Sequence, residues 1–218
     1  MDDKITSITA ETIFDSRNKE TLRVTVQTNT SEGHASAPSG QSAGSHEARE
    51  LRDPDGGVKK AIELIHTTIT PALIGKSVTD QKEIDSLLIK LDGTKTKEKL
   101  GANSIIGVSI ATARTAASLR NMEFYEYLRE LAPVSPSRDT PLLFMNLLNG
   151  GQHAKNGLNF QEFHVIPLLS TTKEAYKCGI DFDRVLEERI RAQYGSESLD
   201  RGDEGGLIFP GDTAEEAL

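Results

Sequence analysis

The chain has 218 residues, and its 33 Asp and Glu against 25 Lys and Arg give a formal net charge of −8. This acidic balance argues against a surface that binds nucleic acid or an anionic membrane. No apolar run approaches the roughly 20 residues that cross a bilayer, the start lacks a signal peptide, and the single Cys178 excludes an intrachain disulfide. We therefore expect a cytoplasmic protein, with Cys178 packed as a small side chain in a helix.

The first part of the chain predicts a small α+β domain at residues 1–131. Short β-branched runs between turn formers predict a three-stranded meander at residues 5–14, 21–28 and 33–37. Helical periodicity then predicts four helices, at about residues 57–68, 80–91, 102–119 and 123–131. The third is rich in Ala, Ile and Val, so we expect it to be buried on more than one side.

The second part, residues 140–218, predicts the beginning of an α/β (TIM-like) barrel. Residues 132–139 carry two prolines and two serines without a period, which favours a linker. The predicted elements that follow are apolar strands at 142–148 and 161–167, a helix at about 172–192, a short strand before Gly202 and a helix start from Asp212. A complete barrel takes ~250 residues, so we expect this barrel to be incomplete and the chain to be truncated.

Two glycine-containing segments are candidates for a site. Gly202-Asp203-Glu204-Gly205-Gly206 holds two acids between glycines that let the backbone approach a ligand, although such acidic pairs are also common in solvated loops. The small, hydroxyl-rich run at 37–48, which includes Ser39, has the composition of a lid over an anionic substrate and equally that of a flexible linker.

Two further polar segments lie at the edges of the apolar strands, where barrel enzymes place their chemistry. One is Asn149–Asn156, which contains His153, and the other is Gln161-Glu162-Phe163. A lone histidine is more often structural than catalytic, but the preceding glycines and the later amide–carboxylate pair favour a role for His153 in a site.

Taken in order, these segments resemble the enolase family over essentially the whole chain. The matching stretches are Asp15-Ser16-Arg17, the Ser39 loop, Leu91–Thr94 with Lys99–Ser109, the segment around His153, Gln161-Glu162-Phe163 and Gly202–Gly206. Two departures stand out. Asn18-Lys19-Glu20 replaces the family's Gly-Asn-Pro and predicts a looser turn, and Leu207-Ile208-Phe209-Pro210 is one residue longer than the family's Phe-Ala-Pro.

The resemblance implies the reversible dehydration of the small molecule 2-phosphoglycerate to phosphoenolpyruvate, with Mg²⁺ as the cofactor. It implies that Glu204 is the acid that protonates the departing hydroxide and that Glu162 is its paired carboxylate. His153 corresponds to a substrate contact, Gln161 and Glu162 lie at the substrate site, and Ser39 corresponds to a ligand of the second magnesium.

No residue of the chain matches the family's catalytic lysine or its carboxylate ligands for the first magnesium. Three interpretations follow: a truncated enolase, inactive alone; half of a split enolase that needs a second chain; or a non-catalytic domain for binding or oligomerisation. The family also implies a homodimer or a higher homo-oligomer.

Overall fold

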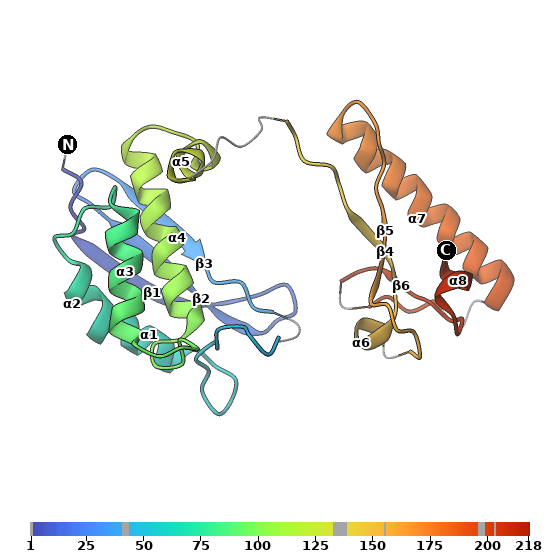
Figure 1. The fold of residues 1–218 in the computed structure, drawn as a ribbon, viewed down its shortest axis with the longest axis horizontal. Helices are drawn as coiled ribbons and strands as arrows, with labels where there is room; N and C mark the ends of the chain where they lie inside the picture. The colour runs from blue at the N-terminus through green and yellow to red at the C-terminus, as the bar shows by residue number, and fades with distance from the viewer. Residues whose placement is uncertain (1, 41–43, 133–138, 155, 196–198, 203) are drawn as a thin grey trace. The chain divides into compact units, whose positions relative to one another are not determined.

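The computed structural model describes residues 2–40, 44–132, 139–154, 156–195, 199–202 and 204–218. The chain divides into two compact units, Met1–Pro136 and Ser137–Leu218 (Figure 1), and each is described by itself. The predicted boundary segment 132–139 stays a prediction, because residues 133–138 lie outside the described residues.

The first unit begins with the predicted meander. Strands β1 (Ser7–Phe14), β2 (Glu20–Gln27) and β3 (Glu32–Ser36) form an antiparallel sheet in the order β1-β2-β3. The central strand β2 alternates in burial because one face of the sheet is covered, and Leu22, Val24 and Val26 on that face are fully buried.

The turn between β1 and β2 is closed by hydrogen bonds, and its expected loosening stays a prediction. One carboxylate oxygen of Asp15 accepts hydrogen bonds from the backbone N–H of Arg17 at 2.9 Å and of Lys19 at 2.8 Å. Asn18 adopts a left-handed backbone with φ 58°, a conformation that asparagine tolerates better than most residues. The Asp15 side chain and Asn18 therefore define the turn without glycine or proline.

Helices follow the sheet in the predicted order. They are α1 (Lys59–Leu64), the π-helix η1 (Ile65–Ile69), α2 (Thr70–Leu73), α3 (Gln81–Asp92), α4 (Ala102–Leu119) and α5 (Phe124–Leu131). The first helical run continues to Leu73 instead of ending at 68, because Pro71 stands in the first turn of α2, where its missing N–H costs little. The Thr70 hydroxyl donates to the Ile65 carbonyl at 2.8 Å and supports the junction.

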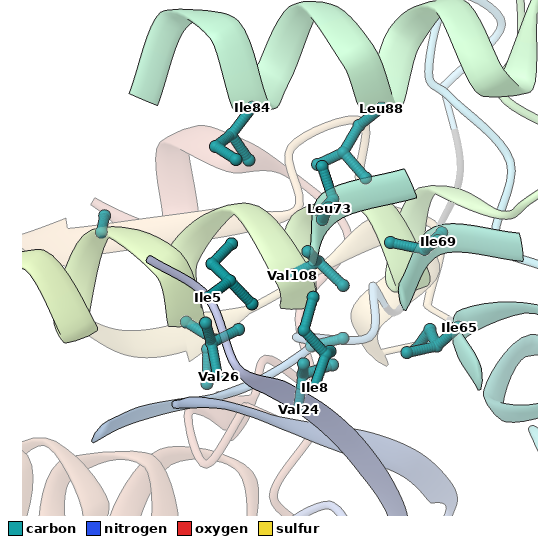
Figure 2. Packing of buried hydrophobic residues seen from close by; sticks show 14 of the residues in the cluster. Ile5, Ile8, Val24, Val26, Ile65, Ile69, Leu73, Ile84, Leu88 and Val108 are labelled. Carbon is teal, nitrogen blue, oxygen red and sulfur yellow. The ribbon is translucent and has the colours of Figure 1, made fainter. Parts of the chain in front are cut away.

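The core of the first unit lies between the sheet and these helices. Figure 2 shows Val24 and Val26 of β2, Val108 of α4 and Ile84 and Leu88 of α3 pointing toward one another, and all five are buried. Helix α4 approaches β3 closely, and a Cβ placed on Gly33 would stand 2.4 Å from the backbone nitrogen of Thr115. The expected burial of α4 is confirmed.

A histidine contacts the free edge of the sheet. The backbone N–H of Ala10 in β1 donates to Nε2 of His66 in η1 at 3.1 Å. Strand β1 is an edge strand, so this N–H has no neighbouring strand to bond. The His66 side chain therefore satisfies an N–H that the sheet itself leaves unpaired.

The buried carboxylate of Asp92 organises the loop after α3. It accepts from the backbone N–H of Thr94 at 2.9 Å and of Leu100 at 2.8 Å, and from the Thr94 hydroxyl. Burial alone would raise the pKa of Asp92, but these hydrogen bonds and nearby Lys97 together hold it below its ordinary value of 3.8.

We expect Asp92→Asn to lower the free energy of unfolding of the first unit by about 2 kcal/mol, because its amide would face the buried Leu100 N–H. A carboxyl group whose pKa is lower in the folded protein than in the unfolded chain stabilises the fold fully above the unfolded pKa. This stabilisation is lost as the pH falls through the folded pKa. The difference in unfolding free energy between wild type and Asp92→Asn should therefore narrow below pH 3.8. Urea unfolding followed by amide signals of α3 measures this. Glu63→Gln, which removes only an exposed pair with Lys60, should change little, and a gap that is constant with pH would contradict the assignment.

The second unit holds a three-stranded sheet with one long helix on it. Its elements are β4 (Met145–Asn149), α6 (Gly151–Ala154), β5 (Glu162–Val165), α7 (Thr172–Tyr194), β6 (Leu207–Ile208) and α8 (Ala214–Ala217). The order is β5-β4-β6, with β5 antiparallel and β6 parallel to β4. The described part of this unit contains no closed barrel, as expected.

Of the short strand expected before Gly202, the described residues 199–202 form only an isolated bridge between Arg201 and Leu207, and the strand β6 lies after the glycine-containing turn. Leu207 and Phe209 are buried and alternate with the half-buried Ile208, which is the pattern of a strand against a core. These residues pack with Leu148 and Ile190, so the longer Leu-Ile-Phe-Pro segment is accommodated.

Helix α7 buries Ala175, Gly179 and Ile190, while Cys178 is exposed, so its expected packing is wrong. Cys178 lies beside Gly179 in sequence and points off the buried stripe. In the described ranges, every helix is too short or too polar to cross a membrane.

Candidate functional site

Ser39, the candidate residue of the first unit, is held by two arginines. The guanidinium of Arg17 donates to the Ser39 carbonyl at 2.8 Å, and Arg52 donates to the Ser39 hydroxyl oxygen at 3.0 Å. The Ser39 hydroxyl lies 3.5 Å from a carboxylate oxygen of Glu50, which itself pairs with Arg52 at 2.8 Å. Ser39 lines an open hollow of about 1090 Å³, and the neighbouring residues 41–43 lie outside the described residues.

In this arrangement, the Ser39 hydroxyl is not open to a magnesium ion. The guanidinium of Arg52 already donates to the hydroxyl oxygen that would bind the cation. The positively charged guanidinium of Arg17 donates to the carbonyl of the same serine. Throughout the described ranges, no group of three or more His, Cys, Asp or Glu side chains is gathered as a metal site. Ser39 would have to leave Arg52 to bind a cation.

Glu204, the candidate acid, is fixed by a strand amide of the second unit. Nδ2 of Asn146 in β4 donates to Oε2 of Glu204 at 2.9 Å. Nδ2 of the fully buried Asn149 in turn donates to Oδ1 of Asn146 at 3.1 Å and to the Gln161 carbonyl at 3.2 Å. The exposed carboxyl group of Glu204 is therefore aimed by a chain of two asparagines that starts in the core.

Gly206 leaves room for this asparagine pair. A Cβ on Gly206 would stand 2.4 Å from Oδ1 of Asn149 and 3.2 Å from Oδ1 of Asn146. The glycine therefore allows the turn that carries Glu204 to approach β4 closely.

Glu162, the candidate paired carboxylate, contacts a histidine that the sequence analysis missed. Oε2 of Glu162 lies 3.0 Å from Nε2 of His164, two residues later in β5. His164 is also the cross-strand partner of Asn146, and Asn149 is the partner of Glu162. The same sheet face thus carries the side chains that contact Glu204 and Glu162.

The missed residues had signals in the sequence. Glu162 and His164 have the two-residue spacing that places side chains on one face of a strand, and Asn146 is a polar residue inside the otherwise apolar run 142–148. The cross-strand pairing of these residues follows from the antiparallel register of β4 and β5, which neither strand's sequence specifies by itself.

The two remaining candidates from the sequence are Gln161 and His153. The side chain of Gln161 is exposed, and its carbonyl accepts from the Gly150 N–H at 3.0 Å, which closes the loop around α6. His153 lies in α6, and its side chain is outside the described residues, as is all of Asp203.

Chemically, the second unit offers a carboxyl group oriented by an amide, a carboxylate beside an imidazole, and a glycine turn that approaches them. These groups suit proton transfer to or from a small ligand. Ser39 and its arginines belong to the first unit, which is described separately.

Comparison with known proteins gives two family matches. Residues 5–128 match the N-terminal domain of enolase, and residues 138–218 match the enolase C-terminal TIM barrel domain, which confirms the predicted fold class. The chain is 45% identical to enolase B of Dictyostelium discoideum over 98% of its own length and 50% of that protein. It is 40% identical to the enolase of Thermococcus kodakarensis over 95% of its own length and 49% of that protein.

The chain therefore spans about half the length of the curated relatives it matches. The two domain matches follow one another in the order of the resemblance and together cover most of the sequence. On these matches, the chain belongs to the enolase family.

Proposed function

We propose that this chain takes part in the reversible dehydration of 2-phospho-D-glycerate to phosphoenolpyruvate, as a cytoplasmic, Mg²⁺-dependent glycolytic enzyme of the phosphopyruvate hydratase type. The observation that carries the proposal is the 2.9 Å hydrogen bond from Asn146 to Glu204, which aims the carboxyl group of the matched acid. The names of the relatives support the reaction class.

In the proposed reaction, a base outside the matched residues removes the proton at C2, and the hydroxyl at C3 leaves with a proton from Glu204. Asn146 holds one oxygen of Glu204 and fixes the direction of the carboxyl group. Glu162, which pairs with His164 at 3.0 Å, is the proposed partner carboxylate of Glu204. His153 and Gln161 are the proposed substrate contacts.

Magnesium, when bound, would neutralise the charge that gathers on the substrate carboxylate. We assign no step to the metal, because the Ser39 hydroxyl is engaged by Arg52. Ser39 remains the proposed ligand of the second magnesium, on the condition that this contact opens. The homodimer implied by the family is also part of the proposal.

A completed enzyme tests the proposal. The 218 residues are joined in frame to the part of Dictyostelium discoideum enolase B that follows the matched region, and phosphoenolpyruvate formation is measured by ultraviolet absorbance. We expect turnover by the completed enzyme and none by the 218 residues alone, because none of their residues matches the base. A folded completed enzyme without turnover, or turnover by the 218 residues alone, would contradict these roles.

The same two pieces, produced as separate chains and mixed, decide between the remaining interpretations. Recovered turnover shows that the piece acts as half of a split enzyme. A stable mixture of unassociated pieces, together with an active fused form, shows that covalent continuity is required.

A further inference from the structure

Arg201 connects the turn that carries Glu204 to helix α7. Its Nη1 donates to the Gly205 carbonyl at 2.8 Å and to Oδ1 of Asp183 at 3.2 Å. Its Nη2 donates to Oδ2 of Asp183 at 2.9 Å and to Oε2 of Glu187 at 3.0 Å. The guanidinium of Arg201 thus forms a bidentate pair with the Asp183 carboxylate, a geometry that holds an arginine in one orientation.

The turn itself is a closed unit. The N–H of Gly202 donates to the Gly206 carbonyl at 2.9 Å, and the N–H of Gly205 donates to the Gly202 carbonyl at 2.9 Å. Gly205 has φ 85°, a left-handed conformation that favours glycine. Because these hydrogen bonds close the turn, a displacement of the Gly205 carbonyl also displaces the adjacent Glu204.

Glu204 is consequently held from two sides. Asn146 of β4 holds the side chain, and Arg201 holds the backbone one residue later against two acids of α7. Removal of the backbone anchor takes away one of the two described holds on this exposed carboxyl group.

We infer that Arg201 is a positioning residue, which orients the carboxyl group of Glu204 for proton transfer by anchoring the Gly205 carbonyl to Asp183 and Glu187. The catalytic part of this inference rests on the proposed function. Arg201 acts only through Glu204, and it follows that its effect on turnover requires a functional Glu204.

Arg191 provides a matched control. It lies on α7, the helix of Asp183 and Glu187, and donates to the other oxygen of Glu187 at 2.6 Å rather than to the turn. Exposed ion pairs of this kind contribute little to the stability of a protein. If Arg201 were only a surface ion pair, Arg201→Met and Arg191→Met would have the same effect on every measurement.

The kinetic experiment uses the completed enzyme. We expect Arg201→Met to lower kcat about 10-fold with little change in KM, because a misdirected acid slows the chemical step without weakening binding. Arg201→Lys should recover only part of the rate, since one ammonium cannot reproduce the fork to Asp183 and the carbonyl. Arg191→Met should retain the wild-type kcat, and the melting temperatures of the two methionine variants should agree.

A double-mutant cycle tests the route through Glu204. In a Glu204→Gln background, Arg201→Met should no longer change the residual kcat. Equal kcat losses from Arg201→Met and Arg191→Met, or an undiminished Arg201→Met effect in the Glu204→Gln background, would overturn the inference.

A second readout needs no activity. In the labelled 218-residue chain, Arg201→Met should shift the carboxyl carbon resonance of Glu204 and speed hydrogen exchange of the Gly205 amide, while Arg191→Met leaves both unchanged. If the completed enzyme has no turnover, the proposed function fails and these signals alone decide the positioning role. Identical Glu204 and Gly205 signals in the two variants would refute it.

Discussion

Replacement of Glu204 by Gln should lower kcat of the completed enzyme by about 10²-fold or more, which is the scale of a lost general acid. The Gln carbonyl can still accept the Asn146 hydrogen bond, so the turn and its orientation should persist. The loss should therefore fall on the chemical step, with KM close to wild type.

Glu188→Gln is the control for this charge change, because Glu188 is exposed and pairs with Arg184 on α7. Steady-state kinetics and a melting curve on both variants separate a chemical effect from a folding effect. Wild-type turnover in Glu204→Gln would remove Glu204 from the proposed role of acid.

Gly33→Ala should be the most destabilising single substitution considered for the first unit, at about 3 kcal/mol or more. Its Cβ would lie 2.4 Å from the Thr115 nitrogen, 2.7 Å from the Arg114 carbonyl carbon and 2.9 Å from the Ala111 oxygen. All three atoms belong to the backbone of α4, so no side chain can rotate away, and the helix must separate from β3.

Chemical denaturation followed by amide signals of β2 and α4 measures this loss. Gly44→Ala is the control in the same unit, because the added Cβ would meet the Glu47 side chain at an ordinary contact distance of 3.6 Å. Equal unfolding midpoints for the two variants would contradict the close packing of α4 on β3.

The sequence predicted the first unit well because local and long-range signals agree there. The alternation of Leu22, Val24 and Val26 matches their burial against α3 and α4, and Asp80 caps α3 by accepting from the Glu83 N–H at 3.0 Å. The end of the first helical run was wrong because it depends on the Thr70 hydroxyl and on a π-helix, which a 3.6-residue period does not describe.

The second unit was harder to predict because its short strands depend on their neighbours. Leu207–Ile208 has only two residues, and its assignment depends on pairing with Leu148 and Asn149 in β4. The antiparallel direction of β5 was also absent from the local sequence. It places Glu162, at the beginning of β5, beside Asn149 at the end of β4, so loops after strand ends are not the sole source of site residues.

For the site itself, motif resemblance identified Glu204, Glu162, Gln161, His153 and Ser39, whose roles stay predictions. The partners Asn146 and His164 needed three-dimensional pairing, since 58 residues separate Asn146 from Glu204. The same holds for Arg52 on Ser39, which comes from a loop 13 residues later.

The contact between His66 and Ala10 bears on self-association of this chain. An uncovered edge strand presents backbone groups to which a strand from another molecule can add. On β1, such a strand would have to displace the imidazole to reach the Ala10 N–H. The His66 side chain therefore protects this position of the sheet edge against intermolecular β-pairing.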